Sequence, residues 1–315
     1  MAKLMMGTTE VLKVMMGSEE VTSLFMGSEE IPSSGSPEPV IDYSTMPFTV
    51  QALEDGNLTI NFGNVDYSTD GGNTWNTTTG PTTLNISSGD TVQIRKTNIY
   101  QSNVLSNNTA ITFNAYGNVM SLIYGDNFIG QTTISVDNAF NSLLKDTAVV
   151  DASNLILPAT VIGATNAYYR MFYNCSGLTA APELPATTLA SNCYQQMFYD
   201  CISLTTAPEL PATTLAINCY GGMFKGCVNL TTAPELPATT LVNGCYNQMF
   251  QMAYVSQNRT LNFIKCLATD ISASDCLTDW LQWVKPQSGT FVKAAGVTWP
   301  SGNSGIPTGW SVVDA

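Results

Sequence analysis

A 26-residue unit recurs in the second half of the chain and constrains the fold more than any other feature. It reads LPATTLAxNCYxxMFxxCxxLTTAPE and is seen best between Leu184 and Phe250. Met-Phe pairs mark the interval at 171–172, 197–198, 223–224 and 249–250, and prolines mark it at 185, 211 and 237. A period in the twenties is typical of solenoids, whose units are too small to bury their own apolar faces and stack on their neighbours. We therefore expect a solenoid over residues 128–260.

Each unit contains two segments of different character. Residues 204–215, LTTAPELPATTL, are extended, because prolines on both sides of Glu209 exclude a regular helix. Residues 218–224, NCYGGMF, can form a helical turn. The sequence thus predicts a strand plus a short helix in each 26-residue coil.

Six cysteines belong to the repeat and form two columns, at 175, 201 and 227 and at 193, 219 and 245. Strand spacing would place equivalent Cα atoms roughly 5 Å apart, which is compatible with disulfides. The columns end in Ala167 and Ala253, and alanine is the replacement expected for a thiol that acts as a small buried hydrophobe. A complete pairing also exists between Cys175 and Cys193, Cys201 and Cys219, and Cys227 and Cys245. We favour reduced, buried thiols, and the disulfide alternative stays open. No CxxC spacing indicates a metal site.

Further columns supply candidate ligand-binding residues. Glu183, Glu209 and Glu235 are in register, and stacked carboxylates must face water or a cation because they repel one another. A solvated stripe is the simpler interpretation. Tyrosines also recur beside amide side chains, a combination that stacks on and hydrogen-bonds sugars, although tyrosines at a repeat position are commonly packing residues. The candidate ligand surface comprises Tyr194, Tyr220, Tyr246, Gln196, Gln248, Glu183, Glu209 and Glu235.

A shorter repeat, of ten residues, opens the chain: AKLMMGTTEV, LKVMMGSEEV and TSLFMGSEEI, over residues 2–31. Each copy joins an apolar, β-prone half to a glycine-containing turn, so we expect very short strands and turns. Thirty such residues cannot form a core alone, and their apolar side chains need a partner from identical chains or another protein. The predicted anchor residues are Leu4, Met5, Met6, Gly7, Val14, Met15, Met16, Gly17, Leu24, Phe25, Met26 and Gly27. Residues 33–39, SSGSPEP, read as a linker.

Between the two repeats, residues 37–127 are predicted to form an antiparallel β-sandwich. Seven segments alternate with period two between turn signals, at 48–53, 57–63, 65–69, 83–87, 90–96, 110–116 and 119–125. Residues 68–75, STDGGNTW, resemble the Asp-box of sialidase propellers, in which the motif is a hairpin turn. The resemblance implies a structural role for Asp70 and Trp75. A sialidase site is not expected, because it needs three converging arginines and this chain has only Arg95, Arg170 and Arg259.

Both ends of the solenoid are expected to be covered. Residues 138–144 can form a short helix with Phe140, Leu143 and Leu144 on one face, which would shield the first coil. Residues 261–315 are predicted to be a C-terminal cap, with a short helix through Asp279 to Trp283 capped by Ser272 or Ser274. Trp280, Trp283, Trp299 and Trp310 would supply its apolar lid. The expected domains are therefore 1–36, 37–127, 128–260 and 261–315, in a mainly β chain.

Composition excludes several classes of function. The chain has no histidine, which excludes Ser-His-Asp and Cys-His catalysis and every His-ligated zinc site. Eleven basic residues against 24 acidic ones give a net charge of −13, so nucleic acid and anionic membrane surfaces are not expected as partners. No apolar run could span a bilayer, and Gly7, Glu10 and Lys13 interrupt any h-region of a signal peptide. We expect neither enzymatic activity, nor a cofactor, nor a bound metal.

The repeat residues LxxxPxxLxxNCYxxMFxxCxxL resemble the BspA-type leucine-rich repeats of Bacteroidales surface proteins and of phages that infect them, over residues 150–265. The C-terminal FIKCLATDISASDC, GTFVKAA and SGIPTGW look like the terminal segment of such proteins, and the decapeptides resemble those that open phage structural proteins. The resemblance implies a fibre or decoration protein of a virion, similar to those of crAss-like phages. Its expected partners are other virion proteins through residues 2–31, a host-surface glycan or protein, and further copies in a dimer or trimer. A BspA-type bacterial surface adhesin and a decoration without receptor binding are the alternatives.

Overall fold

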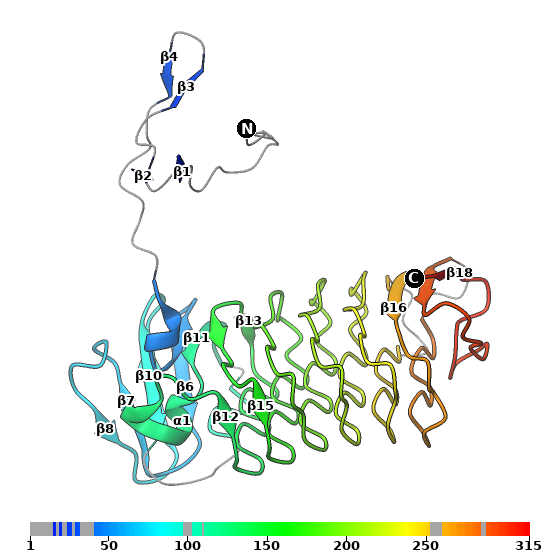
Figure 1. Ribbon diagram of the computed structural model, residues 1–315. Helices are drawn as coiled ribbons and strands as arrows, with labels where there is room; N and C mark the ends of the chain where they lie inside the picture. Colours follow the sequence, from blue (N-terminus) through cyan, green and yellow to red (C-terminus); the bar gives the residue numbers. More distant parts are fainter. Residues whose placement is uncertain are drawn as a thin grey trace. The chain divides into compact units, whose positions relative to one another are not determined.

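The computed structural model describes residues 15–16, 19–20, 24–26, 29–31, 41–96, 103–108, 110–252, 260–284 and 288–315. The chain divides into two compact units, residues 1–42 and 43–315. It is mainly β with few helices, as predicted (Figure 1). The predicted boundaries at residues 127 and 260 lie inside the second unit and stay predictions.

The first unit contains two β-hairpins. Strand β1 (Met15–Met16) pairs with β2 (Glu19–Glu20), and β3 (Leu24–Met26) pairs with β4 (Glu29–Ile31), both antiparallel. Met16 lies opposite Glu19, and Met26 lies opposite Glu29, so equivalent positions of successive decapeptides occupy equivalent places. In each of these two decapeptides the described residues therefore form one antiparallel pair of short strands, as the short-strand prediction implies.

The second unit begins with seven strands. They are β5 (Phe48–Ala52), β6 (Gly56–Ile60), β7 (Val65–Ser68), β8 (Asn76–Thr77), β9 (Thr82–Ile86), β10 (Thr91–Lys96) and β11 (Phe113–Asn118). Strands β11, β5, β10, β7 and β8 form one antiparallel series, and β6 pairs separately with β9. Alternating apolar residues form the core, among them Phe48, Val50, Leu58, Val92 and Phe113, each fully buried.

One segment of this region differs from the prediction. Residues 119–125 were expected to be a strand, but α1 (Ser121–Tyr124) and a 3₁₀ turn, Gly125–Asn127, occupy this place. The Ser121 hydroxyl accepts a hydrogen bond from the Phe48 amide at 2.9 Å and donates to the Ile94 carbonyl at 3.1 Å. Because the Ser121 side chain bonds to both β5 and β10, the Ser121 backbone cannot also pair in a strand beside them. This tertiary contact overrides the alternating pattern of residues 119–125.

The Asp-box-like turn between β7 and β8 has the structural role predicted for it. Asp70 accepts hydrogen bonds from the Thr74 amide at 2.9 Å, the Thr74 hydroxyl at 2.6 Å and the Ser68 hydroxyl at 2.7 Å. These bonds, those from Thr74 above all, lower the pKa of Asp70 from 3.8 to about 2. Trp75 donates to the Gly72 carbonyl, and the Arg95 guanidinium lies 3.9 Å from the centroid of its ring.

Repeat units follow from residue 131 and are joined by a regular hydrogen-bond ladder. The even-numbered amides of Asn166 to Asn174 donate to carbonyls of the next unit, as Tyr168 does to Cys193 and Phe172 to Met197. The odd-numbered amides from Tyr169 to Cys175 donate to the third carbonyl back along the chain. Every amide from Tyr168 to Cys175 thus has a partner, half of them within the unit and half across units.

This alternation replaces the short helix predicted for each unit. Every fourth residue has a positive φ, as at Asn166 (55°), Arg170 (55°) and Asn174 (57°), and again one repeat later at Asn192 (58°), Gln196 (56°) and Asp200 (56°). An α-helix does not tolerate a left-handed residue in each turn, so the segment is a series of tight turns. The helices predicted at 138–144 and up to Trp283 are wrong for the same reason, because φ is positive at Asn138, Ser142, Asp275, Asp279 and Trp283.

The opposite side of the units is held by parallel β pairing. Strand β12 (Thr133–Ile134) pairs with β15 (Val161–Ile162), and a single bridge continues this column from Val161 to Thr188. A bridge joins Asp151 of β13 (Val149–Asp151) to Ala180 of the next unit. Bridges from Thr206 to Thr232 and from Thr232 to Phe263 lead to β16 (Phe263–Cys266). In Figure 1 the units follow one another in register between β12 and β16.

Aromatic rings fill the interior along the same columns. Phe172, Phe198, Phe224 and Phe250 are fully buried and stack with centroids 5.4–5.6 Å apart. Tyrosines of a second column stack in the same way, with centroids 5.4–6.1 Å apart. Stacking thus repeats the same ring contact at each unit.

The segment that contains strands β5 to β11 covers the first repeat unit directly. The amides of Asn103, Leu105 and Asn107 donate to carbonyls of residues 141, 143 and 145, and so extend the ladder by one step. Strand β11 also pairs in parallel with β13 and with β14 (Leu155–Ile156). Residues 138–146 therefore form a repeat unit themselves, and the shield that was predicted there comes from residues 103–108 and β11.

The last units end in a parallel three-stranded sheet of β16, β17 (Thr290–Lys293) and β18 (Ser311–Asp314). Trp280 is fully buried, stacks on Tyr246 at 6.3 Å and on Trp299 at 5.7 Å, and donates its indole N–H to the Gly305 carbonyl at 2.9 Å. Trp299 and Trp310 are also buried, whereas Trp283 is 38% exposed. Three of the four predicted lid tryptophans thus contribute to the closed end.

Candidate functional site

The predicted glutamate column lies on the surface. Glu183, Glu209 and Glu235 are all exposed, and the Lys265 ammonium lies 2.9 Å from a carboxylate oxygen of Glu235. This arrangement is the solvated stripe that the sequence indicates, with one ion pair at the end nearest β16.

The predicted tyrosine column, in contrast, is closed to a ligand. Tyr194, Tyr220 and Tyr246 are each 1% exposed, and their rings are covered on both faces by neighbouring rings of the stack. Burial raises the pKa of all three well above 10. These tyrosines are packing residues, and their assignment to a ligand surface was wrong.

A different set of tyrosines reaches the surface, on the side of the units that carries the turns. Tyr173 and Tyr199 are half-buried and one repeat apart, and their rings stack at 4.6 Å with an interplanar angle of 14°. The Lys145 ammonium lies 5.7 Å from the Tyr173 centroid, and the Lys225 ammonium lies 5.5 Å from the Tyr199 centroid. Two stacked rings are thus enclosed between two lysines in one column.

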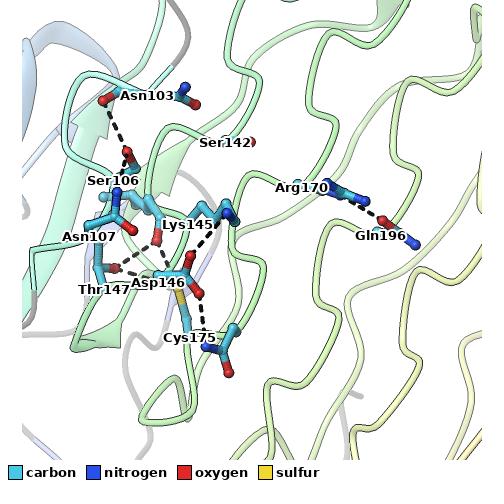
Figure 2. A network of polar contacts seen from close by, with 12 residues as sticks. Asn103, Ser106, Asn107, Ser142, Lys145, Asp146, Thr147, Arg170, Cys175 and Gln196 are labelled. Atoms are coloured by element: carbon cyan, nitrogen blue, oxygen red, sulfur yellow. Dashed lines mark hydrogen bonds and ion pairs between the residues drawn. The ribbon is translucent and has the colours of Figure 1, made fainter.

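The predicted glutamines lie in the adjacent column and join this arrangement. Gln196 accepts a hydrogen bond from Arg170 Nε at 2.7 Å, and Gln248 accepts one from Lys225 Nζ at 3.0 Å. Figure 2 shows Arg170 and Gln196 reaching toward each other from neighbouring units. We call these residues the turn-face strip: Lys145, Arg170, Tyr173, Gln196, Tyr199, Lys225 and Gln248.

Acidic side chains balance the two lysines of the turn-face strip. Asp146 lies 3.1 Å from Lys145 and accepts a hydrogen bond from Asn174 at 2.8 Å (Figure 2). Desolvation raises the pKa of Asp200 and lowers the pKa of Lys225, and the attraction between the two charges opposes both shifts. The strip is therefore a nearly neutral, mutually hydrogen-bonded surface and is no cationic patch.

The composition of the strip resembles that of protein interfaces. Half-buried tyrosines held by their neighbours lose little conformational entropy on contact, and tyrosine and arginine are enriched in interfaces. The sequence contained a signal for it, because Tyr173 and Tyr199 share the 26-residue interval. The signal was missed because Tyr168, Tyr194, Tyr220 and Tyr246 form the longer column.

The predicted anchor residues belong to the first unit. Met15 and Met16 form β1, and Leu24, Phe25 and Met26 form β3. Leu4, Met5, Met6, Gly7, Val14, Gly17 and Gly27 lie outside the described residues. The backbone of the hairpins agrees with the predicted short strands, and the contacts of the anchor side chains stay a prediction.

The repeat cysteines are free and buried, as favoured from the sequence. In one column the same bond recurs: the thiols of Cys175, Cys201 and Cys227 donate to the carbonyls of Leu144, Phe172 and Phe198 at 2.9–3.1 Å. Burial raises the pKa of Cys175 to about 11 and the pKa of Cys193 to about 12. Thiols in this state are poor nucleophiles, because the thiolate is the reactive form.

Alkylation is expected to distinguish the two redox alternatives. Native protein treated with iodoacetamide at neutral pH should keep all six repeat cysteines unmodified, because their thiols are buried and protonated. Unfolding in denaturant without reductant should then expose eight alkylatable thiols, the number in the chain. Mass spectrometry counts the adducts in both states. Fewer than eight adducts in the unfolded chain would show that disulfides form after all.

Within the described ranges, no group of three or more cysteine, aspartate or glutamate side chains is placed to hold a metal ion. Among the helices of the same described residues, none has both the length and the apolar character needed to cross a bilayer.

No family model matches the chain, and neither the curated proteins nor the solved structures include one that is significantly similar to it.

Proposed function

We propose that this chain is a non-enzymatic structural protein of a bacteriophage particle, a head or tail fibre or decoration. In this proposal the N-terminal hairpins attach it to other virion proteins, and the repeat units present the turn-face strip to the host surface. The repeats are then a solenoid of the BspA leucine-rich type in which a series of turns replaces the short helix. The protein would assemble in the host cytoplasm and act on the virion, as a dimer or trimer.

The division into two unequal units carries the proposal. The described strands of residues 1–42 are two or three residues long and pair only as isolated hairpins, and such hairpins are marginally stable in water. Residues 43–315 have a continuous core of their own. A small unit that needs a partner, joined to a large one that does not, is the organisation of an anchored display protein.

The exposed chemistry favours adhesion as the role of the displayed part. The turn-face strip offers tyrosine edges, amides and paired cations on a backbone held rigidly by the ladder. Its partner would be a host-surface glycan or protein that hydrogen-bonds to this strip. The alternatives are a bacterial surface adhesin and a virion decoration that binds no receptor.

Two changes in the gene, made separately, test the proposal. Deleting residues 2–31 should remove the protein from purified particles, measured by mass spectrometry, while residues 43–315 remain folded by circular dichroism. Replacing Tyr173 and Tyr199 by serine should leave the protein on the particle and lower adsorption to host cells at least about tenfold, which corresponds to a loss of about 1.4 kcal/mol in binding.

Ile202→Ala is the control for adsorption, because this side chain is 44% exposed and no part of the turn-face strip. Unchanged adsorption of the double serine variant would favour the decoration without receptor binding. Retention of the deleted protein on particles would refute the anchor.

A further inference from the structure

A cavity of about 550 Å³, open to solvent on one side, lies in the C-terminal cap, beside β17 and β18. Its volume falls in the range of small-molecule binding sites, about 300–1,000 Å³. It is separate from the turn-face strip and shares no residue with it. Its lining combines aromatic, aliphatic and hydroxyl side chains, chiefly Trp299, Trp310, Ile306, Thr298, Ser301 and Thr308.

Packing behind the cavity holds its aromatic walls in place. Trp299 stacks on Trp280 at 5.7 Å and meets the edge of Phe291 at 5.0 Å. Trp310 lies so close to Gly289 that a Cβ at this position would overlap the indole ring. Both tryptophans of the lining are more than nine-tenths buried. The walls are therefore formed before any ligand arrives, which lowers the entropic cost of binding.

The polar groups of the cavity fall into two sets. Thr298, Ser301 and Thr308 are exposed and place hydroxyl groups at the mouth. The indole N–H of Trp299 is buried and finds no acceptor among the described residues. Because this N–H is closed to solvent, the hydroxyls at the mouth are the polar groups that a ligand reaches.

The charges of the cavity and of the whole chain restrict the class of ligand that the cavity can bind. Lys293 is the one charged side chain among the described lining residues, and it forms an ion pair with Asp314. Its charge is therefore already balanced. The chain as a whole carries a net charge of −13, which repels anions. The cavity thus favours an uncharged ligand.

We propose that the cap cavity binds an uncharged saccharide of one or two rings. The apolar C–H face of a pyranose lies against the exposed edges of the two tryptophans and against Ile306, and its ring hydroxyls bond to the hydroxyls at the mouth. This inference rests on the proposed adhesion and deepens it, because it names a ligand class for a second site on the displayed part of the chain.

Nuclear magnetic resonance of the ¹⁵N-labelled full chain tests this directly. The five tryptophans give five indole N–H signals, and Trp299→Phe identifies the signal of Trp299. Glucose, galactose, mannose and N-acetylglucosamine are titrated to millimolar concentrations, with glucuronate as the anionic counterpart of glucose. At least one uncharged sugar should shift the Trp299 signal saturably, and glucuronate should bind more weakly than glucose.

Matched variants locate the binding. Thr308→Arg places a long side chain at the mouth and should weaken binding at least tenfold. Thr187→Arg makes the same change at an exposed position on the repeats and should leave binding unchanged. No saturable shift with any uncharged sugar, equal binding by Thr308→Arg, or tighter binding of glucuronate would each overturn the proposal.

The outcomes are distinguishable from those of the adsorption test. If the double serine variant loses adsorption and no sugar binds, the adhesion proposal stands and the cavity proposal falls. If sugars bind in the cavity and adsorption depends on neither site, the cavity proposal stands and the adhesion proposal falls.

Discussion

Replacing Phe198 by alanine is expected to lower the free energy of unfolding of residues 43–315 by about 3–5 kcal/mol. Phe198 is fully buried and stacks on Phe172 at 5.4 Å and on Phe224 at 5.6 Å. The hydrogen-bond ladder fixes the spacing of these units, so neighbouring rings cannot close the space that the missing ring leaves. The loss is a large fraction of the roughly 5–15 kcal/mol that stabilises a typical domain.

Urea denaturation followed by circular dichroism measures this loss. Ile202→Ala lies in the same unit with a side chain 44% exposed, and it should change the free energy of unfolding by less than about 0.5 kcal/mol. A loss below about 1.5 kcal/mol for Phe198→Ala would mean that the ladder yields and the units collapse onto one another.

Valine in place of Asn192 is expected to destabilise the same unit by about 1–3 kcal/mol. Asn192 has a φ of 58°, which a β-branched residue adopts only with strain. Its amide also donates to the Ile217 carbonyl in the next unit, so the backbone cannot relax without breaking the ladder. The substitution thus tests the left-handed residue as the cause of the turns.

Two controls separate strain from the loss of the amide side chain. Asn192→Gly should cost far less, because glycine adopts this φ freely and Gly244 already occupies the same column with a φ of 65°. Asn243→Val replaces an exposed asparagine without a positive φ and should be nearly neutral. Equal midpoints for Asn192→Val and Asn192→Gly in thermal unfolding would contradict this account of the turns.

The sequence predicted the features that depend on one residue type at a regular interval. The hairpins follow the ten-residue spacing of Met-Gly pairs, and the interior rings follow the 26-residue spacing of Met-Phe pairs. The buried thiols were favoured because alanine continues their columns, and the turn at Asp70 followed from its motif. In each of these cases the type of residue at the position is enough to determine its local surroundings.

The prediction that placed Tyr194, Tyr220 and Tyr246 on a ligand surface was wrong, because it required knowing the direction of their side chains. Tyr168 and Tyr169 are adjacent in the chain, yet the first is fully buried and the second is only partly buried. If this segment of the repeat were a helix, as predicted from NCYGGMF, the two tyrosine side chains would point in other directions than they do in the series of turns. The asparagines at 166, 192 and 218 were the visible sign of turns, because asparagine tolerates the left-handed conformation.

The sequence by itself determined the two periods, the mainly β character and the residue types of the interior, because these depend on composition at fixed spacing. Only the tertiary structure decided that half of the turn amides bond across units, which excludes helices and turns Tyr173 and Tyr199 outward. It alone decided that residues 103–108 cover the first unit and that Trp299 and Trp310 line one open cavity. These contacts join residues far apart in the chain, and no local pattern encodes which of them will meet.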